Sequence, residues 1–240
     1  VCSYGVTDRH GVDAGRRGLE ENRRFIANGG RGMVGVHAAF TCSDELLNDA
    51  AGLAVDLGVG VHIHVAEGID DVAAGERLEG LAQENWLLVH CVHLDRDLRG
   101  TIAHNPRSNM NNGVGYARPA QRKNNVLLGT DGIGADMLEE VRLAYVAARA
   151  DNVLLSPELA WSWLQNGYDF IPECRDDKVV WNYDHVDSAW HVAFTPGTRA
   201  LNVQSSTGEV LLQDGRPTRV DLSEVRRKAS EAAQRLFSKL

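Results

Sequence analysis

The sequence predicts an α/β fold in which helices cover a parallel sheet. Short apolar runs, such as those that open residues 86–94 and 126–132, alternate with stretches whose apolar residues recur at helical spacing. Near-continuous apolar strands are typical of parallel sheets, because helices bury both faces of such a sheet. Five of these runs end near a His, Glu or Asp residue. Since the carboxyl ends of parallel strands share one edge, the sequence predicts a polar site at that edge.

Length and composition limit the classes of protein that the sequence can encode. The 240 residues, 43% of them hydrophobic, are enough for one large domain, alone or with a small appendage. A formal net charge of −8 argues against a nucleic-acid partner or an anionic membrane surface, both of which favour a basic face. No apolar run approaches the length of a membrane span. The four cysteines show no C-x-x-C spacing, which predicts reduced thiols in a cytoplasmic protein.

Strands and helices are predicted to alternate along the first 150 residues. The first helix carries apolar residues at Leu19 and Phe25 and stops at Asn28, which two glycines follow. The second begins after Ser43, a residue type that caps helix N-termini, and stops at Gly58. The predicted strands are residues 1–7, 33–40, 59–65, 86–94, 100–109 and 126–132, and the predicted helices are 12–27, 44–57, 72–83 and 136–150.

The last part of the chain predicts a small antiparallel β-unit followed by a helix. Short apolar runs separated by turn residues predict strands at residues 178–183, 191–194, 200–203 and 209–212, with a turn at 213–216. Asp221 is predicted to cap the final helix, with Glu224 in the position of a capping box. The apolar residues of this helix share one side and are predicted to be buried, namely Val225, Ala229, Ala232, Ala233, Leu236 and Leu240.

The connection between the fourth and fifth predicted strands is too short for a parallel crossover. Only residues 94–99 separate His93 from Gly100, whereas a crossover between parallel neighbours needs about a dozen residues or more. Either these strands are not parallel neighbours, or the sequence omits residues. We favour omission, because residues 95–98 have the character of a helix start that does not continue.

Residues 58–67 combine a buried strand with side chains suited to metal-assisted chemistry. Successive side chains of a strand point to opposite faces, so His62 and His64 share one face. Glu67 follows where the strand gives way to a loop. A neutral imidazole is a common ligand of divalent metals, and a nearby carboxylate can move protons to and from a water that the metal activates. A single histidine on a strand is more often structural than functional. A functional site is favoured here because the other apolar runs also end near His or Asp residues.

Five motifs, in this order, make the chain similar to the metal-dependent amidohydrolase superfamily. The motifs lie at residues 35–41, 62–67, 90–94, 104–110 and 128–132. Within the superfamily, the chain most resembles the aminohydrolase/chlorohydrolase branch, which includes SsnA-like proteins, guanine deaminase and the triazine hydrolases. Each motif alone is weak, and the ordered set is specific.

This resemblance implies a distorted (β/α)8 barrel of the TIM type with a small β-sandwich and a C-terminal helix. Residues 1–175 would supply roughly strands 3–8 of the barrel, and residues 176–240 would supply a portion of the β-sandwich and the terminal helix. The family's first strand brings a His-x-His metal pair, and no such pair occurs upstream of His37. We therefore expect the chain to be part of a longer native protein.

The resemblance also implies metal-binding and catalytic roles for four residues. His64 matches a metal ligand, and Asp131 matches a carboxylate that binds the metal and accepts the proton of the attacking water. Glu67 matches the general acid/base that passes this proton to the substrate ring. His90 matches the histidine that orients the water or polarises the substrate.

Three residues are expected to contact the substrate. His37 and His90 match substrate-contacting positions of the family, and Asn105 belongs, with His104 and Ser108, to a motif that shapes the pocket. His62 shares a face with the predicted ligand but has no ligand counterpart in the family. We therefore interpret His62 as a core histidine.

The family's chemistry implies hydrolytic deamination of an N-heteroaromatic ring of the purine, pyrimidine or triazine type. It also implies one divalent metal, with zinc as the first expectation and iron as the alternative. The expected partners are a small-molecule substrate and a second copy of the chain in a homodimer, with no nucleic acid and no membrane. Two other functions stay open. One is hydrolysis of another C–N or C–Cl bond, and the other is a non-catalytic scaffold that lacks the His-x-His pair.

Overall fold

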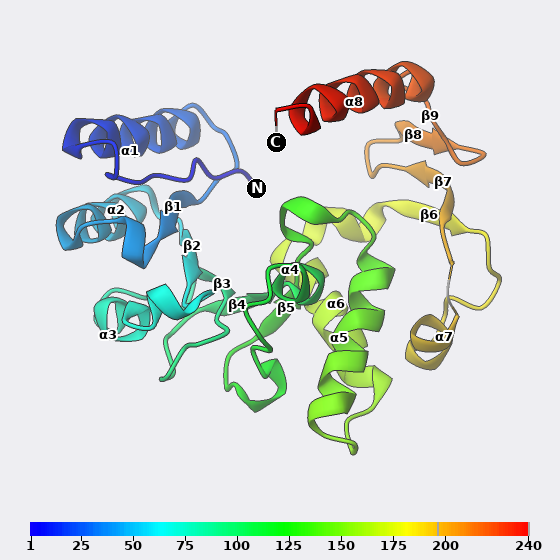
Figure 1. The fold of residues 1–240 in the computed structure, drawn as a ribbon, viewed down its shortest axis with the longest axis horizontal. Coiled ribbons are helices and arrows are strands. Elements are labelled where there is room, and N and C mark those ends of the chain that lie inside the picture. The colour runs from blue at the N-terminus through cyan, green and yellow to red at the C-terminus, as the bar shows by residue number, and fades with distance from the viewer. Residues whose placement is uncertain (196, 240) are drawn as a thin grey trace. The chain divides into compact units, whose positions relative to one another are not determined.

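A computed structural model describes residues 1–195 and 197–239, and the chain divides into two compact units, Val1–Gly167 and Tyr168–Leu240. The first unit contains a five-stranded parallel sheet, and the second contains a four-stranded antiparallel sheet (Figure 1). The predicted α/β class is therefore confirmed. The closed barrel and the β-sandwich remain predictions.

The parallel sheet keeps its strands in chain order. Every residue of the central strand β3 is buried, as the apolar run predicts: the successive residues Leu88 and Val89, which point to opposite faces, are 0% and 6% exposed. Helices α1 and α2 pack against the strand β1 at one end of the sheet, and α5 packs against β5 at the other. The strands are β1 Val34–Ala38, β2 Val61–Val65, β3 Leu87–His90, β4 Thr101–His104 and β5 Val126–Leu128.

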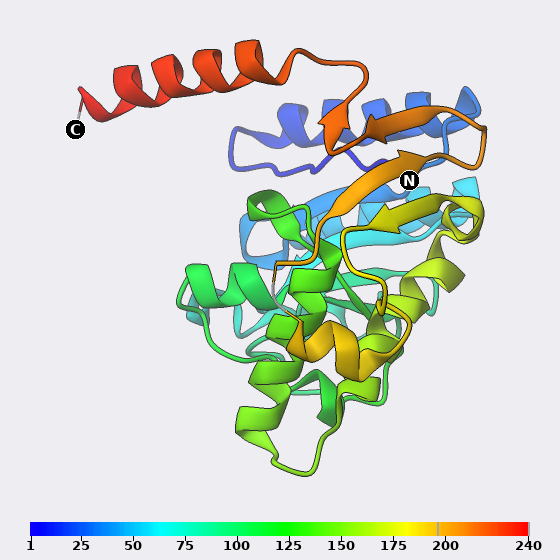
Figure 2. The same cartoon turned by 90° about the vertical axis from the view of Figure 1, so that its right-hand side faces the viewer.

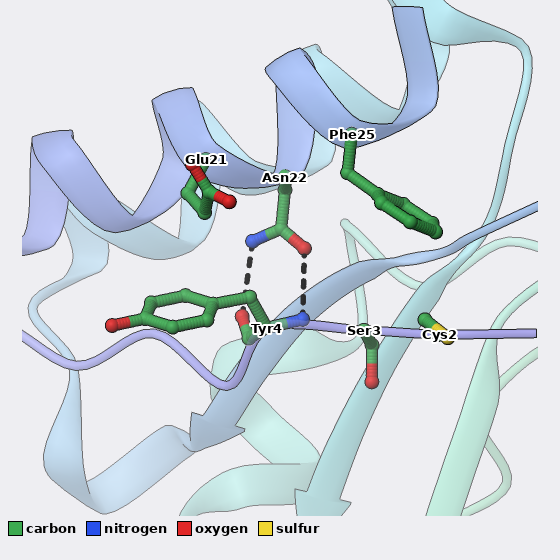
Figure 3. Close-up of a pocket in the computed structure, with 6 residues that line it drawn as sticks. All are labelled: Cys2, Ser3, Tyr4, Glu21, Asn22 and Phe25. Atoms are coloured by element: carbon green, nitrogen blue, oxygen red, sulfur yellow. Dashed lines mark hydrogen bonds between the residues drawn. The ribbon is translucent and has the colours of Figure 1, made fainter. Parts of the chain in front are cut away.

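The first seven residues, predicted as a strand, form only two isolated parallel bridges beside β1, at Cys2 and Val6. Between these bridges, the side-chain amide of Asn22 takes the place of ladder hydrogen bonds. Its Oδ1 accepts from the backbone N–H groups of Tyr4, at 3.0 Å, and Gly35, at 3.1 Å, and its Nδ2 donates to the carbonyl oxygen of Tyr4 at 3.0 Å (Figure 3). A helix side chain thus joins this segment to the edge of the sheet.

The predicted helix boundaries are accurate where the sequence contains a cap. In α2, Ser43 Oγ accepts from the backbone N–H of Leu46 at 3.2 Å, and Gly58 ends the helix with a φ of 65°. Helix α3 is shorter than the predicted 72–83 and has no side-chain cap. The helices of the first unit are α1 Val12–Ala27, α2 Asp44–Leu57, α3 Ala74–Leu78, α4 Pro106–Asn111, α5 Met137–Asp151 and α6 Pro157–Phe170, the last of which runs into the second unit.

Strands β3 and β4 are parallel neighbours although no helix joins them. The interpretation that they are not neighbours is therefore wrong. The predicted strand at 100–109 ends at His104, and the helix α4 follows it directly. Proline at the first helical position favours this start, because its missing N–H would have no helical partner there.

The second unit contains the strands β6 Lys178–Trp181, β7 Ala200–Gln204, β8 Val210–Gln213 and β9 Arg216–Pro217 (Figure 2). The predicted strand at 191–194 is wrong, because these residues belong to the helix α7 Ala189–Phe194. Ser188 caps this helix by accepting from the backbone N–H of His191 at 3.2 Å. The local cap therefore outweighs the apolar pattern.

The terminal helix α8 Leu222–Phe237 begins as predicted, because Asp221 accepts from the backbone N–H groups of Ser223 and Glu224. Its predicted buried face is wrong for the described residues, none of which is buried in this helix; Val225 is 50% exposed and Leu236 is 60% exposed. Leu240 lies outside the described residues. None of the helices in residues 1–195 and 197–239 is long and apolar enough to span a bilayer.

Candidate active site

The six predicted site residues lie at the carboxyl ends of the parallel strands. Two of them, His37 and His64, are in β1 and β2 themselves, and His90 is the last residue of β3. Asn105 follows β4 directly, and Asp131 opens the short 3-10 turn after β5. The remaining residue is Glu67, two residues beyond the end of β2.

His90 is the centre of this cluster. Its Nε2 lies 3.7 Å from Oε2 of Glu67 and 3.9 Å from Oδ2 of Asp131. Its ring centroid is 5.4 Å from that of His64. The side chain of His90 is 1% exposed, whereas those of Glu67 and Asp131 are 31% and 33% exposed. The structure therefore brings the three predicted catalytic side chains together, with the two carboxylates open to solvent.

The orientation of His64 suits a metal ligand. Its Nδ1 lies 2.7 Å from the backbone carbonyl oxygen of His37 and must donate to it, which leaves the lone pair on Nε2. Burial lowers the pKa of His64, and the nearby His90 lowers it further. The imidazole of His64 is therefore neutral near pH 7, as metal binding requires.

His37 and His62 flank His64. Nδ1 of His37 lies 2.9 Å from Oγ1 of Thr41, whose hydroxyl donates to the carbonyl oxygen of Ala38; Nδ1 of His37 is therefore the donor. Burial lowers the pKa of His37 and lowers that of His62 to about 4. Both rings are neutral near pH 7. His37 is exposed, and His62, predicted to be a core histidine, is only half-buried, like His64.

Asp131 is fixed as a carboxylate. Oγ of Ser108 donates to its Oδ2 at 2.5 Å, and the backbone N–H of Gly132 donates to its Oδ1 at 2.7 Å. Burial favours the neutral acid, but these hydrogen bonds outweigh burial and lower the pKa of Asp131. The residue is ionised at neutral pH, as a metal ligand or proton acceptor must be.

Four non-glycine residues with positive φ lie at the strand ends around the cluster. The φ angles are 47° at Ala66, 71° at His90, 54° at Cys91 and 50° at Asp131. Such conformations are uncommon outside glycine and are concentrated at functional sites, where surrounding contacts maintain them. The backbone thus turns sharply at the residues that present His90 and Asp131.

The cluster fits a metal by ligand type but not by ligand number. The free Nε2 of His64 and the carboxylate of Asp131 are suitable donors for zinc or iron. Catalytic zinc sites generally use three protein ligands. Among residues 1–195 and 197–239, no three His, Cys, Asp or Glu side chains are placed so that together they could hold one metal ion. His64 and Asp131 would therefore be part of a larger ligand set.

Two residues that contact the cluster, Asn109 and Asn112, were not predicted from the sequence. Asn105, the predicted substrate contact, is 2% exposed, and its Nδ2 lies 3.4 Å from Nδ1 of His90. Nδ1 of His90 also lies 2.8 Å from Oδ1 of Asn109, and Nδ2 of Asn112 donates to Oε1 of Glu67 at 3.1 Å. Ser108, which the motif predicted to shape the pocket, is the partner of Asp131. The signal for the two asparagines is the concentration of Ser and Asn at residues 108–112, soon after the end of β4.

A separate hollow of about 210 Å³ lies between α1 and the first residues of the chain (Figure 3). It contains none of the six predicted site residues, and its only buried polar side chain, Asn22, is occupied by the backbone hydrogen bonds described above. Its lining residues are Cys2, Ser3, Tyr4, Glu21, Asn22 and Phe25. We therefore assign no part of the candidate active site to this hollow.

The sequence matches the family described as "Amidohydrolase family" over residues 4–165. It is 27% identical to a 5'-deoxyadenosine deaminase of Methanopyrus kandleri, across 99% of this chain and 67% of the relative. It is 37% identical to a 5-methylthioadenosine/S-adenosylhomocysteine deaminase of Desulfitobacterium hafniense, across 54% of this chain and 38% of the relative. The first alignment spans 293 positions, more than the 240 residues of this chain. That relative therefore contains residues, within the matched span, that this chain lacks.

Solved structures with a similar fold include two zinc-containing enzymes. An adenosine deaminase from Xanthomonas campestris with bound zinc superposes with a TM-score of 0.78 at 17% identity, over 98% of this chain and 66% of that protein. The atrazine chlorohydrolase TrzN of Arthrobacter aurescens, complexed with zinc, superposes with a TM-score of 0.69 at 21% identity, over 90% of this chain and 60% of that protein.

Proposed function

The chain belongs to the amidohydrolase family, and we propose that it carries the catalytic face of a hydrolase that removes the amino group of an adenine-type nucleoside as ammonia. The deaminase relatives named above support the reaction and the substrate class. The chain spans 67% of the first of these relatives and 38% of the second. The activity proposed is therefore that of the whole protein to which these residues contribute.

The observation that carries this proposal is the convergence of two carboxylates on one ring nitrogen of His90. In the proposed reaction, Asp131 accepts one proton from the attacking water, and Glu67 passes the other to a ring nitrogen of the purine. The proton on Asp131 then goes to the amino group, which leaves the adjacent carbon as ammonia while the water oxygen becomes the carbonyl oxygen. His90 orients the water or polarises the ring, and His37 and Asn105 contact the substrate.

His64 and Asp131 would hold one divalent metal, with zinc preferred and iron as the alternative. When bound, such an ion lowers the pKa of a water molecule from about 15.7 toward about 7. Glu67 is placed to handle protons without being a ligand, because one of its oxygens faces His90 and the other accepts from Asn112.

An ammonia-release assay tests the proposal. The purified protein, supplied with zinc, is incubated with adenosine, 5'-deoxyadenosine and 5'-methylthioadenosine, and with guanine, cytosine and a chlorotriazine for comparison. We expect ammonia and the corresponding inosine product from the adenine nucleosides. Chloride release from the triazine without ammonia from any nucleoside would contradict deamination and support the chlorohydrolase alternative.

Glu67→Gln is the variant that tests the proton transfer. The glutamine side chain keeps the size of the glutamate and an acceptor oxygen but does not bind a proton at neutral pH. Since general acid–base catalysis contributes about 10²- to 10⁴-fold, we expect kcat to fall by at least about 100-fold with the metal content unchanged. Near-native kcat in this variant would show that the proton shuttle is assigned to the wrong residue.

A further inference from the structure

One short helix reaches all three predicted catalytic residues. Ser108 on α4 donates to Asp131, Asn109 on α4 contacts His90, and Asn112, which caps α4, donates to Glu67. The partners Glu67, His90 and Asp131 come from three different strand ends. The helix after β4 is therefore in contact with each side chain on which the proposed reaction depends.

The contact with His90 is the most shielded of the three. Asn109 is 2% exposed and His90 is 1% exposed, and the distance between Oδ1 and Nδ1 is 2.8 Å. An amide oxygen can only accept a hydrogen bond, so Nδ1 of His90 must carry the proton. The more distant Nδ2 of Asn105, at 3.4 Å, cannot donate to the same nitrogen in this state. The 2.8 Å contact therefore sets the tautomer for the amide orientation that the structure shows, in which Nδ2 of Asn109 has no hydrogen-bond partner among the described residues.

The tautomer determines what His90 presents to the two carboxylates. With the proton on Nδ1, the lone pair of the neutral ring is on Nε2, the nitrogen that faces Glu67 and Asp131. A lone pair at this position can accept a hydrogen bond from a water molecule lying between the two carboxylates. The opposite tautomer would present an N–H there and could not accept.

We propose that Asn109 is a positioning residue that holds His90 in the Nδ1–H tautomer and so makes Nε2 an acceptor for the attacking water. This inference rests on the proposed function for its catalytic consequence, but the tautomer itself does not depend on activity. Asn109 acts through His90 and does not reach the carboxylates, because its partner is the nitrogen on the far side of the ring.

Helix α4, which presents Asn109 to His90, is anchored to α5 by a buried carboxylate. The carboxylate of Glu140 on α5 is fully buried and binds Arg107 on α4 twice, through the backbone N–H at 3.3 Å and through Nε at 2.8 Å. These bonds hold α4 against α5 at its first turn. Asn109 therefore projects from an anchored helix, and its amide is held where His90 needs an acceptor.

Three variants separate the hydrogen bond from simple packing. Asn109→Leu keeps the approximate volume but removes the acceptor, and Asn109→Asp keeps the shape with oxygens that only accept. Met110→Leu is the matched control, since Met110 is on the same helix but its side chain is 53% exposed and lies outside the proposed machinery. We expect Asn109→Leu to lower kcat by about 10- to 100-fold, the range found when hydrogen-bond partners of the residues that bind a catalytic metal are lost. We expect Asn109→Asp to keep most of the kcat, and KM to change little in either variant.

Nitrogen-15 NMR of the histidine rings gives a readout that needs no activity. We expect His90 to show the Nδ1–H tautomer in the unaltered protein, in Asn109→Asp and in Met110→Leu, and to lose it in Asn109→Leu. An Nε2–H tautomer in the unaltered protein would overturn the inference, as would equal loss of kcat in the Leu and Asp variants. If the tautomer is as expected but no nucleoside is deaminated, the proposed function fails and the assignment of Asn109 to the tautomer stands.

Discussion

Glu67 and Asp131 face the same ring nitrogen of His90, although they lie 64 positions apart in the chain. They differ in how their carboxylates are held. Asp131 accepts from Ser108 and from the backbone of Gly132, whereas Glu67 accepts from the exposed Asn112. Asp131 is therefore the more rigid of the two, which suits a ligand, and Glu67 is freer to move, which suits a residue that carries protons between partners.

His104 is the histidine whose environment most opposes a charge. It is 0% exposed, and its ring contacts the rings of Tyr116 and Trp163 edge-on, each at a centroid distance of 5.9 Å. Among the described residues, neither of its ring nitrogens has a hydrogen-bond partner. Burial lowers the pKa of His104 to about 3, with a further contribution from His90.

Replacing His104 by Phe should make the protein less sensitive to acid. Between about pH 6.5 and about pH 3, the unfolded chain binds a proton at His104 that the folded chain does not bind, so stability falls as the pH falls. This histidine contributes about 1.4 kcal/mol per pH unit within that window. We expect urea unfolding to show a smaller loss of the free energy of unfolding for His104→Phe than for the unaltered protein, on going from about pH 6.5 to about pH 5.

His104→Phe should also be more stable than the unaltered protein at neutral pH, by about 1 to 3 kcal/mol, because it removes two buried ring nitrogens that have no hydrogen-bond partner among the described residues. The exposed His10 provides the control, because His10→Phe leaves the buried ring in place and should keep the full acid sensitivity. An unchanged pH dependence in His104→Phe would show that other groups cause the acid-side loss of stability.

At the scale of elements, the pair α4–α5 is what positions the polar residues of the site. Glu140 joins the two helices through Arg107, and its own carboxylate is fully buried. Removing Glu140 is costly because both the backbone N–H and Nε of Arg107 lose their acceptor, and hydrogen bonds to charged groups contribute more than neutral ones. Surface ion pairs, by contrast, contribute less than about 1 kcal/mol each.

We expect Glu140→Ala to lower the free energy of unfolding by about 1.5 to 3 kcal/mol, the contribution of hydrogen bonds to a charged group, measured by urea denaturation. Glu20→Ala is the matched control, because Glu20 on α1 pairs with Arg23 at 3.5 Å on the surface and its side chain is 71% exposed. The control should change stability by less than about 1 kcal/mol. Similar small losses in both variants would show that Glu140 does not anchor α4.

At the scale of the whole molecule, the proposed metal needs more ligands than His64 and Asp131 provide. His64 and Asp131 provide two ligand atoms of suitable type, and the described residues provide no group of three. The relatives are longer than this chain. A catalytic zinc site of the usual kind would need a third protein ligand beside these two residues, and the homodimer expected from the family resemblance remains a prediction.

Metal content, measured by plasma mass spectrometry, tests this view. We expect about one zinc or iron per protein, as for a single-metal hydrolase site, and loss of that metal in Asp131→Ala. Asp187→Ala, at an exposed carboxylate in the second unit, should leave the metal content unchanged. Absence of metal even after zinc, iron or manganese is added would favour the non-catalytic scaffold that the missing His-x-His pair suggested.

Local patterns were enough to predict much of this protein. Apolar runs gave the strands of the parallel sheet, and caps such as Ser43 and Asp221 gave the starts of helices, because these signals act between residues a few positions apart. The polar residues at the strand ends, together with the order of the motifs, indicated the amidohydrolase family that the comparison confirms.

Only the tertiary structure decided which atoms meet. The partners Glu67 and Asn112 are 45 positions apart, and the partners His90 and Asn109 are 19 apart; no periodicity relates such residues. The tautomer of His90 and the anchoring of α4 by Glu140 depend on these distant contacts. The helix α8 illustrates the same point. Its amphipathic spacing predicts an apolar face, but that face is buried only if another element packs on it, and none of its described residues is buried. Sequence thus determined the elements and the residues at their ends, and packing between elements determined the hydrogen bonds that give those residues their chemistry.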